Sequence, residues 1–286
     1  MSIYNTFRSY WWDIALLIRH LKLQAKRVWW DALLAWEKAT PALYNKIQTT
    51  YRQQKPSPDA VLSSETYGKV VDVDGIKMRI DRRMSPFQVN KLISGRHTRE
   101  ERRLLLHRLE PNDVVMELGG GIGMLAIACA LKVGGDRVYS YEANPTLESL
   151  IRENYDLNQV HPELKMCMLE EKAGSRTFHV SEHFSRSSAY KPADDNTKAY
   201  EVPVEPLNDE IARIQPSVLI MDVQGSEGEL LSFADLSTVN KLLLEVHPDM
   251  LGINNANSLR RSLRDRGFIE MARSGQSFLY IRQEAN

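Results

Sequence analysis

Cysteine is scarce in this 286-residue chain, which has only Cys129 and Cys167. Cys129 falls in the apolar stretch that follows a glycine-rich turn, and Cys167 falls in a short apolar run. We therefore expect two buried, unpaired thiols and neither a disulfide nor a metal-binding pair. Nothing in this cysteine usage requires an oxidising compartment.

Long hydrophobic runs are also absent. No uncharged stretch approaches the roughly 18–20 apolar residues that a membrane-spanning helix needs. The first apolar stretch is interrupted by Asp13 and Arg19, which argues against a signal peptide. The contents of hydrophobic residues (43%) and charged residues (26%) are ordinary for a globular protein. We expect a cytoplasmic protein with one large domain, or one domain and an extension.

An excess of charge of one sign is lacking overall, because 37 Lys and Arg face 37 Asp and Glu. The charges are nevertheless unevenly spread, since residues 1–55 carry nine basic residues and only three acidic ones. All five tryptophans lie in the first 36 residues, where apolar residues recur at helical spacing. We therefore predict an amphipathic helical extension over residues 1–52 and a linker over residues 53–60. The extension suits peripheral contact with an anionic membrane, or packing on the body of the chain or in a homo-oligomer.

For the remaining residues, 61–286, we predict one α/β domain. A β-hairpin turning at Asp74-Gly75 and a helix over 97–111 form a lead-in at 61–111, followed by a core at 112–286. In the core, apolar strand patterns alternate with helical patterns, and two strands flank Ser274-Gly275-Gln276 at the end. This alternation predicts a doubly wound, mostly parallel sheet with a terminal antiparallel hairpin.

The stretch MELGGGIGMLA at 116–126 predicts a strand, a glycine-rich turn and the start of a helix. Gly121-Ile122-Gly123, with Ala126, fits the G-x-G-x-x-G/A form of a dinucleotide site. Glu117, however, precedes the glycines in the spacing E-x-G-x-G-x-G, and its carboxylate would repel a pyrophosphate. The motif favours S-adenosylmethionine, which carries an ammonium group and a sulfonium but no phosphate.

The ribose of such a ligand needs an acceptor for its two hydroxyls, and Glu142 ends the next strand. Ligands of open α/β sheets bind outside the carboxyl ends of the strands. The glycines allow close approach of the backbone because they have no Cβ. The predicted cofactor-binding residues are Glu117, Gly119, Gly121, Gly123, Glu142, Ala143, Asn144 and Asp222.

Six segments carry a family resemblance over about residues 95–282: GRHTREERRLLLHRLEPNDVVMELGGGIG, YSYEANP, LESLIRENYDLN, VPVEPLNDEI, LIMDVQGSEGELL and LLLEVHP. Together they resemble the FkbM-type family of S-adenosylmethionine-dependent methyltransferases. The family places Asp-Val-Glu-Gly-x-Glu after its fourth strand, and Asp222-Val223-Gln224-Gly225-Ser226-Glu227 departs from that pattern only at Gln224. Asn208 stands where the family usually has Asp.

The resemblance implies a class I methyltransferase fold, Rossmann-like with a seven-stranded sheet, and O-methylation of sugar hydroxyls in glycans, glycolipids or glycosylated small molecules. The acceptor would thus be a small molecule or glycan, and no nucleic acid is expected because the body shows no basic face. A protein or RNA methyltransferase is one alternative. A catalytically idle methyltransferase fold that binds a partner is another, since Gln224 departs from the motif.

Methyl transfer to oxygen benefits from a general base. The candidates at the carboxyl ends of strands are Asp222, Glu245 and His247. Asp222, Glu227 and Glu245 are the alternative ligands of a divalent metal, which the sequence does not require. The remaining histidines of the domain show no ligand pattern and are assigned to the surface or to structure: His97, His107, His161, His179 and His183.

Overall fold

The computed structural model describes residues 64–181, 197–246 and 253–283. These residues belong to one compact unit, Val61–Asn286. The predicted N-terminal extension (1–52) and linker (53–60) lie outside the described residues, so that division of the chain stays a prediction.

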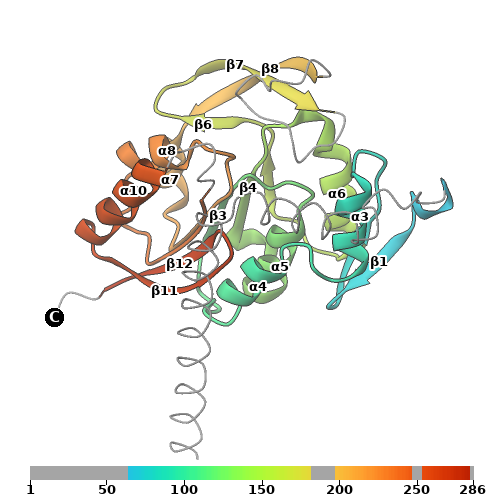
Figure 1. Ribbon diagram of the computed structural model, residues 1–286, viewed down its shortest axis with the longest axis horizontal. Helices are drawn as coiled ribbons and strands as arrows, with labels where there is room; N and C mark the ends of the chain where they lie inside the picture. The colour runs from blue at the N-terminus through green and yellow to red at the C-terminus, as the bar shows by residue number, and fades with distance from the viewer. Residues whose placement is uncertain (1–63, 182–196, 247–252, 284–286) are drawn as a thin grey trace, which may run out of the picture. The chain divides into compact units, whose positions relative to one another are not determined.

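Seven strands form one sheet in the order β11-β12-β10-β9-β3-β4-β5 (Figure 1). The strands are β3 (Val115–Leu118), β4 (Val138–Tyr141), β5 (Glu163–Lys165), β9 (Val218–Met221), β10 (Lys241–Glu245), β11 (Phe268–Ser274) and β12 (Ser277–Arg282). The five from β5 to β10 run parallel, whereas β12 pairs antiparallel with both β10 and β11. Because the chain leaves β3 first toward one edge and then toward the other, the sheet is doubly wound, which confirms the predicted fold class.

Helices cover both faces of this sheet. They are α3 (Pro86–Ile93), α4 (Arg99–Leu105), α5 (Met124–Val133), α6 (Glu148–Leu157), α7 (Leu207–Ile214), α8 (Glu227–Phe233) and α10 (Ile253–Asp265). Alternate strand residues point to opposite faces, so Val115 and Ile220 join one buried cluster with α3 to α6, and Met116 and Met221 join another with α7 and α8. The apolar strand runs are thus explained by burial on both sides.

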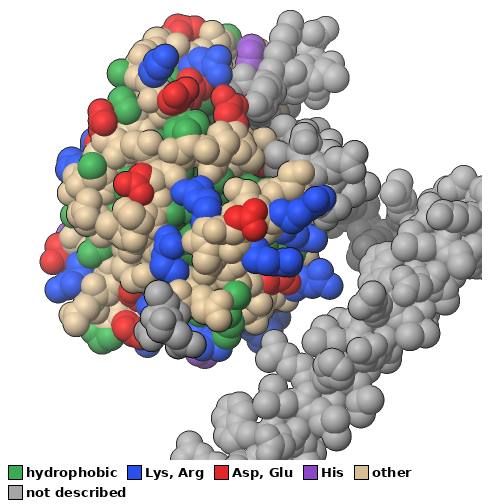
Figure 2. Space-filling model, turned by 90° about the vertical axis from the view of Figure 1, so that its left-hand side faces the viewer, with side chains coloured by type: hydrophobic (Ala, Val, Ile, Leu, Met, Phe, Trp, Pro, Cys, Tyr) green, Lys and Arg blue, Asp and Glu red, His purple; other side chains and the backbone are tan. Residues whose placement is uncertain are grey.

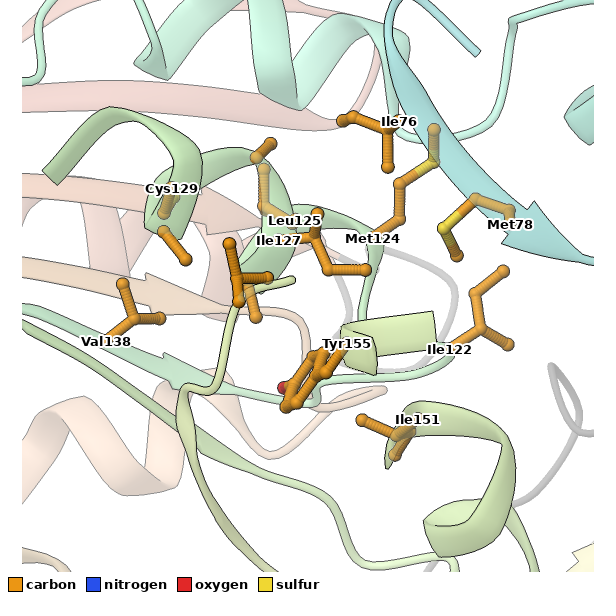
Figure 3. Close-up of a cluster of buried hydrophobic side chains, with 14 of the residues drawn as sticks. Ile76, Met78, Ile122, Met124, Leu125, Ile127, Cys129, Val138, Ile151 and Tyr155 are labelled. Carbon is orange, nitrogen blue, oxygen red and sulfur yellow. The ribbon is translucent and has the colours of Figure 1, made fainter. Parts of the chain in front are cut away.

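The first cluster is centred on α5, whose residues are almost all buried (Figure 3). Met124 and Ile127 pack among side chains from the hairpin strand β2 and from α6, including Met78 and Ile151. Cys129 lies in this cluster and Cys167 in the second, and both are free thiols. The expectation of two buried, unpaired cysteines is confirmed.

The lead-in contains the predicted hairpin, formed by β1 (Val70–Val73) and β2 (Ile76–Arg79). Asp74 and Gly75 both have positive φ, at 53° and 86°, as a tight two-residue hairpin turn requires. The helix predicted over 97–111 is shorter, because it ends at Leu105 and a separate helix, α3, precedes it. The sequence patterns did not predict α3, which Ser85 caps through a capping box with Gln88.

The structure divides the short apolar run around Cys167, LKMCML at 164–169, between two strands. Its first part is the end of β5, whereas Met168–Glu170 form β6 in a different sheet. There β8 (Thr197–Pro206) pairs parallel with β6 and antiparallel with β7 (Gly174–Ser181). The chain therefore changes sheets between Lys165 and Met168, and a second, three-stranded sheet that was not predicted lies beyond the main one (Figure 1).

Asp113 joins the amino ends of three strands at the edge of the sheet away from the pocket described below. Its Oδ1 accepts a hydrogen bond from Oγ of Ser217 at 2.8 Å, and its Oδ2 accepts one from Nζ of Lys241 at 2.6 Å. The backbone N–H of Val114 donates to Oγ of Ser217. The side chains of Asp113 and Lys241 are only 7% and 12% exposed, so neither is solvated well without the other.

We predict that Asp113→Ala lowers the free energy of unfolding by about 3–5 kcal/mol, the usual result of leaving one buried charge without its partner. Urea unfolding at neutral pH measures this change. The matched control is Asp156→Ala, because the Asp156 side chain is 74% exposed, and it should change stability little. Equal stability of the two variants would show that the Asp113 contacts contribute little.

Candidate functional site

A pocket of about 740 Å³ opens at the carboxyl ends of the central strands. Seven of the predicted site residues line it: Glu117, Gly119, Gly121, Glu142, Ala143, Asp222 and Glu245. Gly123 and Asn144, also predicted to bind the cofactor, do not line it, and the predicted base His247 lies outside the described residues. The pocket therefore brings together residues from the ends of β3, β4, β9 and β10.

Two glycines of the loop after β3 have different roles. Gly119 has φ +90°, and a Cβ on it would lie 1.9 Å from the backbone oxygen of Asp222. Gly121 has φ +56°, and nothing lies within 4 Å of the position of its Cβ. Gly119 thus permits the close approach of two backbones, whereas Gly121 leaves space on its pocket side for a ligand. Gly123 is the N-cap of α5, and a Cβ on it would lie 2.9 Å from the ring of Tyr155.

Glu117 is the most deeply buried carboxyl group of the pocket, with 2% exposure. Its Oε2 accepts a hydrogen bond of 2.5 Å from Oγ of Ser140 on β4. Burial raises the pKa of Glu117 to about 8; the Ser140 hydrogen bond opposes this, and the negative charges of Glu142 and Asp222 add to it. A buried carboxyl group of this kind favours a cation beside it.

Glu142 is held by the backbone at both oxygens. Its Oε2 accepts the N–H of Gly121 and its Oε1 accepts the N–H of Asn144, each at 2.7 Å. Burial raises the pKa of Glu142 to about 6, although these N–H groups favour its charged form. A carboxylate has about four acceptor positions on its two oxygens, so Glu142 retains capacity for a hydroxyl donor. Asn144 orients Glu142, and its own side chain caps the turn at Thr146.

The loop after β9 presents Asp222 to the same pocket. Nε2 of Gln224 donates to Oδ1 of Asp222 at 3.3 Å, and Gln224 itself adopts a left-handed backbone with φ +53°. A glutamate at position 224 has no amide to donate and would repel Asp222, so the departure from the family motif is compatible with an ordered loop. Glu227 is fully buried and accepts the N–H of Gly225 at 3.1 Å.

The alternative metal site is not assembled in the described part of the chain. Asp222, Glu227 and Glu245 do not form a group that could hold a metal ion, and no other three His, Cys, Asp or Glu side chains among residues 64–181, 197–246 and 253–283 do so. Glu227 does not line the pocket. The spacing of the three acids along the chain therefore did not translate into convergence in space.

Several lining residues come from segments that the motifs did not point to. His97, assigned above to the surface or to structure, lines the pocket together with Glu101 of α4. Burial lowers the pKa of His97 to about 4, with the charges of Lys91 and Arg102 adding to the effect. The sheet β6-β8-β7 contributes Thr177 and His179. These side chains reach the site through packing of the lead-in and the second sheet.

The pocket fits S-adenosylmethionine on three observations. Its volume lies in the range of small-molecule sites, about 300–1,000 Å³. The buried Glu117 carboxyl suits an ammonium group, and the backbone-held carboxylate of Glu142 suits a pair of hydroxyls. The open side of Gly121 admits close backbone contact. Glu117, Gly121 and Glu142 would hold this cofactor.

Comparison with known proteins agrees with this fit. Residues 70–184 match the model of the TRM5/TYW2 methyltransferase domain. A tRNA (guanine(37)-N(1))-methyltransferase of Phytophthora infestans is 24% identical over 162 residues, 56% of this chain and 37% of that protein. A hexuronic acid methyltransferase of Haloferax volcanii is 26% identical over 147 residues, 51% of this chain and 60% of that protein.

The crystal structure of a methyltransferase FkbM from Methylobacillus flagellatus is also similar, with 17% identity and a TM-score of 0.39 over 61% of this chain and 44% of that one. The chain spans about 37% and 60% of the lengths of the two curated relatives named above.

The chain therefore contains an S-adenosylmethionine-dependent methyltransferase domain, and S-adenosylmethionine is its cofactor. The order of its seven strands is that of class I methyltransferases. These matches do not show membership of the FkbM-type family, which is a narrower assignment. Within the described residues, no helix is both long and apolar enough to cross a membrane.

We predict that S-adenosylmethionine binding releases protons at pH 7. With its pKa near 8, Glu117 is mostly protonated in the free protein, and an adjacent ammonium group lowers that pKa, so the carboxyl group loses its proton. Calorimetric titrations in two buffers of different ionisation enthalpy measure the release. When S-adenosylmethionine binds the Glu117→Gln variant, the number of protons released should be lower than for the wild type by almost one. Equal proton release by the two proteins would place the ammonium group elsewhere.

We further predict that Glu142→Ala weakens S-adenosylmethionine binding by well over tenfold. Two charge-assisted hydrogen bonds to the ribose are lost, at about 1.5–3 kcal/mol each, together with the acceptor that orders Gly121. Calorimetry gives the dissociation constant, and circular dichroism checks the fold. Glu148→Ala removes an exposed carboxylate outside the pocket and should bind normally. An unchanged constant for Glu142→Ala would contradict the assignment.

Proposed function

We propose that this protein transfers the methyl group of S-adenosylmethionine to a hydroxyl of a neutral acceptor, in the first place a sugar or glycosylated small molecule. The resemblance to the FkbM-type family over residues 95–282 supports O-methylation, and the hexuronic acid methyltransferase relative supports a sugar acceptor. A hexuronic acid carries a carboxylate, so this relative supports the sugar and not its neutral charge. The observation that carries the proposal is the charge of the pocket.

The described lining of the pocket holds eight carboxyl groups and only two side chains of Lys or Arg. Its acids are Glu101, Glu117, Glu142, Glu170, Glu201, Asp222, Glu229 and Glu245, and its bases are Lys91 and Arg176. Arg176 is already paired with Glu170 at 2.7 Å. Glu117 is mostly protonated in the free protein and Glu170 is neutralised by Arg176, but the other carboxylates still outnumber Lys91 and repel phosphates and carboxylates. They also offer acceptors to hydroxyl donors.

The outer surface supports the same reading on the side seen in Figure 2, where Lys and Arg are interspersed with Asp and Glu and hydrophobic side chains form small separate groups. A nucleic-acid-binding face concentrates basic residues. The acidic side chains among the basic ones on that side weaken contacts to phosphates, from which RNA binding draws most of its affinity.

The pocket divides into a donor half and an acceptor half. Glu117 and Glu142 hold the donor over β3 and β4, and Asp222 and Glu245 end the next two strands. The cofactor supplies a methyl group bonded to a positively charged sulfur, and the acceptor oxygen takes this methyl group. The hydroxyl proton passes to a carboxylate of the acceptor half, and His247 remains the other proposed base.

Orientation of the reactants supplies most of the acceleration, since a well-placed neighbour contributes about 7–11 kcal/mol. A general base adds about 10²–10⁴-fold to the rate. The carboxylates of the acceptor half therefore act mainly by holding the acceptor oxygen in line.

RNA methylation is the second candidate, because the TRM5/TYW2 domain model matches residues 70–184 and a relative carries a tRNA methyltransferase name. The acidic pocket weighs against it. In both candidates the donor half is the same, so the acceptor decides between them.

We predict that the purified protein, given S-adenosylmethionine with a labelled methyl group, labels neutral glycosides in preference to uronic-acid glycosides and to tRNA. The acidic wall repels the two anionic acceptors. Mass spectrometry locates the label, and heat-inactivated protein is the control. Label in tRNA alone would overturn the proposal in favour of the second candidate.

A further inference from the structure

The first turn of α4 places two adjacent carboxylates on the C-terminal hairpin. Oγ of Ser274 donates to Oε2 of Glu100 at 2.6 Å, and Oγ of Ser277 donates to Oε1 of Glu101 at 2.5 Å. These contacts join residues 174 and 176 positions apart in the sequence. They fix the start of α4 against the edge of the main sheet.

The same helix is fixed from the opposite direction. Arg102 is buried, and its guanidinium group bonds to Oδ2 of Asp74 in the turn of the first hairpin at 3.2 Å. Helix α4 thus spans from one hairpin to the other, and the side chain of Glu101 has little freedom to move away from Ser277.

The two carboxylates differ in what they face. Glu100 is exposed and does not line the pocket, whereas Glu101 is half-buried and lines it. Ser277, which is 2% exposed, lies directly opposite Glu245 in the β10–β12 ladder. Residues directly opposite share a sheet face, with Cβ atoms about 4.5–5.5 Å apart. Glu101 and Glu245 therefore converge beside one serine hydroxyl.

This pair lies on the face of the sheet that carries Glu117. Val115 of β3, Leu243 of β10 and Leu279 of β12 belong to one buried cluster, and the alternation of strand residues places Glu117, Glu245 and Ser277 on the same side. Glu117 follows the proposal in holding the donor over β3, and β10 and β12 lie across β9 from β3. Glu101 is consequently a wall residue of the acceptor half.

The hydrogen bonds of Glu101 leave one oxygen for a ligand. Ser277 donates to Oε1, and no residue in the described ranges donates to Oε2. His97, four residues earlier on the same wall, is uncharged at neutral pH, because burial lowers its pKa to about 4. The negative charge of Glu101 is therefore not neutralised by this histidine and remains for a hydroxyl donor.

We propose that Glu101, oriented by Ser277 and adjacent to Glu245, binds a hydroxyl group of the methyl acceptor and selects neutral polyols over anions. This inference rests on the proposed function. Neither the glycine-rich motif nor the motif after β9 includes Glu101, and its role follows from the packing of α4 on β12.

Glu101→Gln tests the proposal with Glu100→Gln as the matched control. In Glu101→Gln the amide oxygen keeps the Ser277 contact, so an NH₂ group replaces the acceptor at Oε2. The probe is the neutral glycoside that the wild-type protein labels most strongly. We expect Glu101→Gln to raise the acceptor KM or lower kcat/KM for that glycoside at least tenfold. The dissociation constant for S-adenosylmethionine should stay within about twofold.

Glu100→Gln alters the same turn and the same hairpin without touching the pocket, so it should match the wild type in both measurements. If the wild type is active and Glu101→Gln behaves like Glu100→Gln, the inference is overturned and the proposed function stands. If the wild type labels no neutral glycoside, the proposed function is overturned and this inference falls with it. If Glu101→Gln loses cofactor binding together with activity, this inference is also overturned, because the side chain would then serve the donor half.

Discussion

The site depends on the close approach of two backbones at the end of the central strands. Gly119 passes so near the carbonyl oxygen of Asp222 that no side chain fits between them. This approach aligns the loop after β3 with the loop after β9, and it places Glu117 and Asp222 in one pocket. The burial that raises the pKa of Glu117, and the division into donor and acceptor halves, both follow from this alignment.

The proposed donor and acceptor halves of the pocket are built by different means. In the donor half, backbone N–H groups hold Glu142, and a single serine holds Glu117, so the binding groups are fixed by the strands and their turns. In the acceptor half, side chains from α4 and from the three-stranded sheet complete the wall. The donor half thus suits one constant cofactor, whereas the acceptor half can change by substitution on elements that lie outside the central strands.

The same difference explains what could be predicted from the sequence. The carboxyl ends of neighbouring parallel strands meet at one edge, so a strand pattern followed by Glu142 or Asp222 was enough to place these residues together. Glu101 carries no local pattern, because its role depends on a contact with Ser277 that only the folded chain creates. Strand β7 was missed because only Phe178 among its residues is buried, so the apolar half of the usual alternation is lacking. The helix α3 is short, and eight residues give too few turns for a clear period.

The long sequence separation between Glu101 and Ser277 has a consequence for the order of folding. Glu142 and Ser140 reach their donor-half partners across only 21 and 23 residues, whereas Ser277 reaches Glu101 across 176. Closing a longer loop costs more chain entropy, and contacts between distant residues form later on average. The cofactor-holding half is therefore expected to assemble before the wall that receives the acceptor.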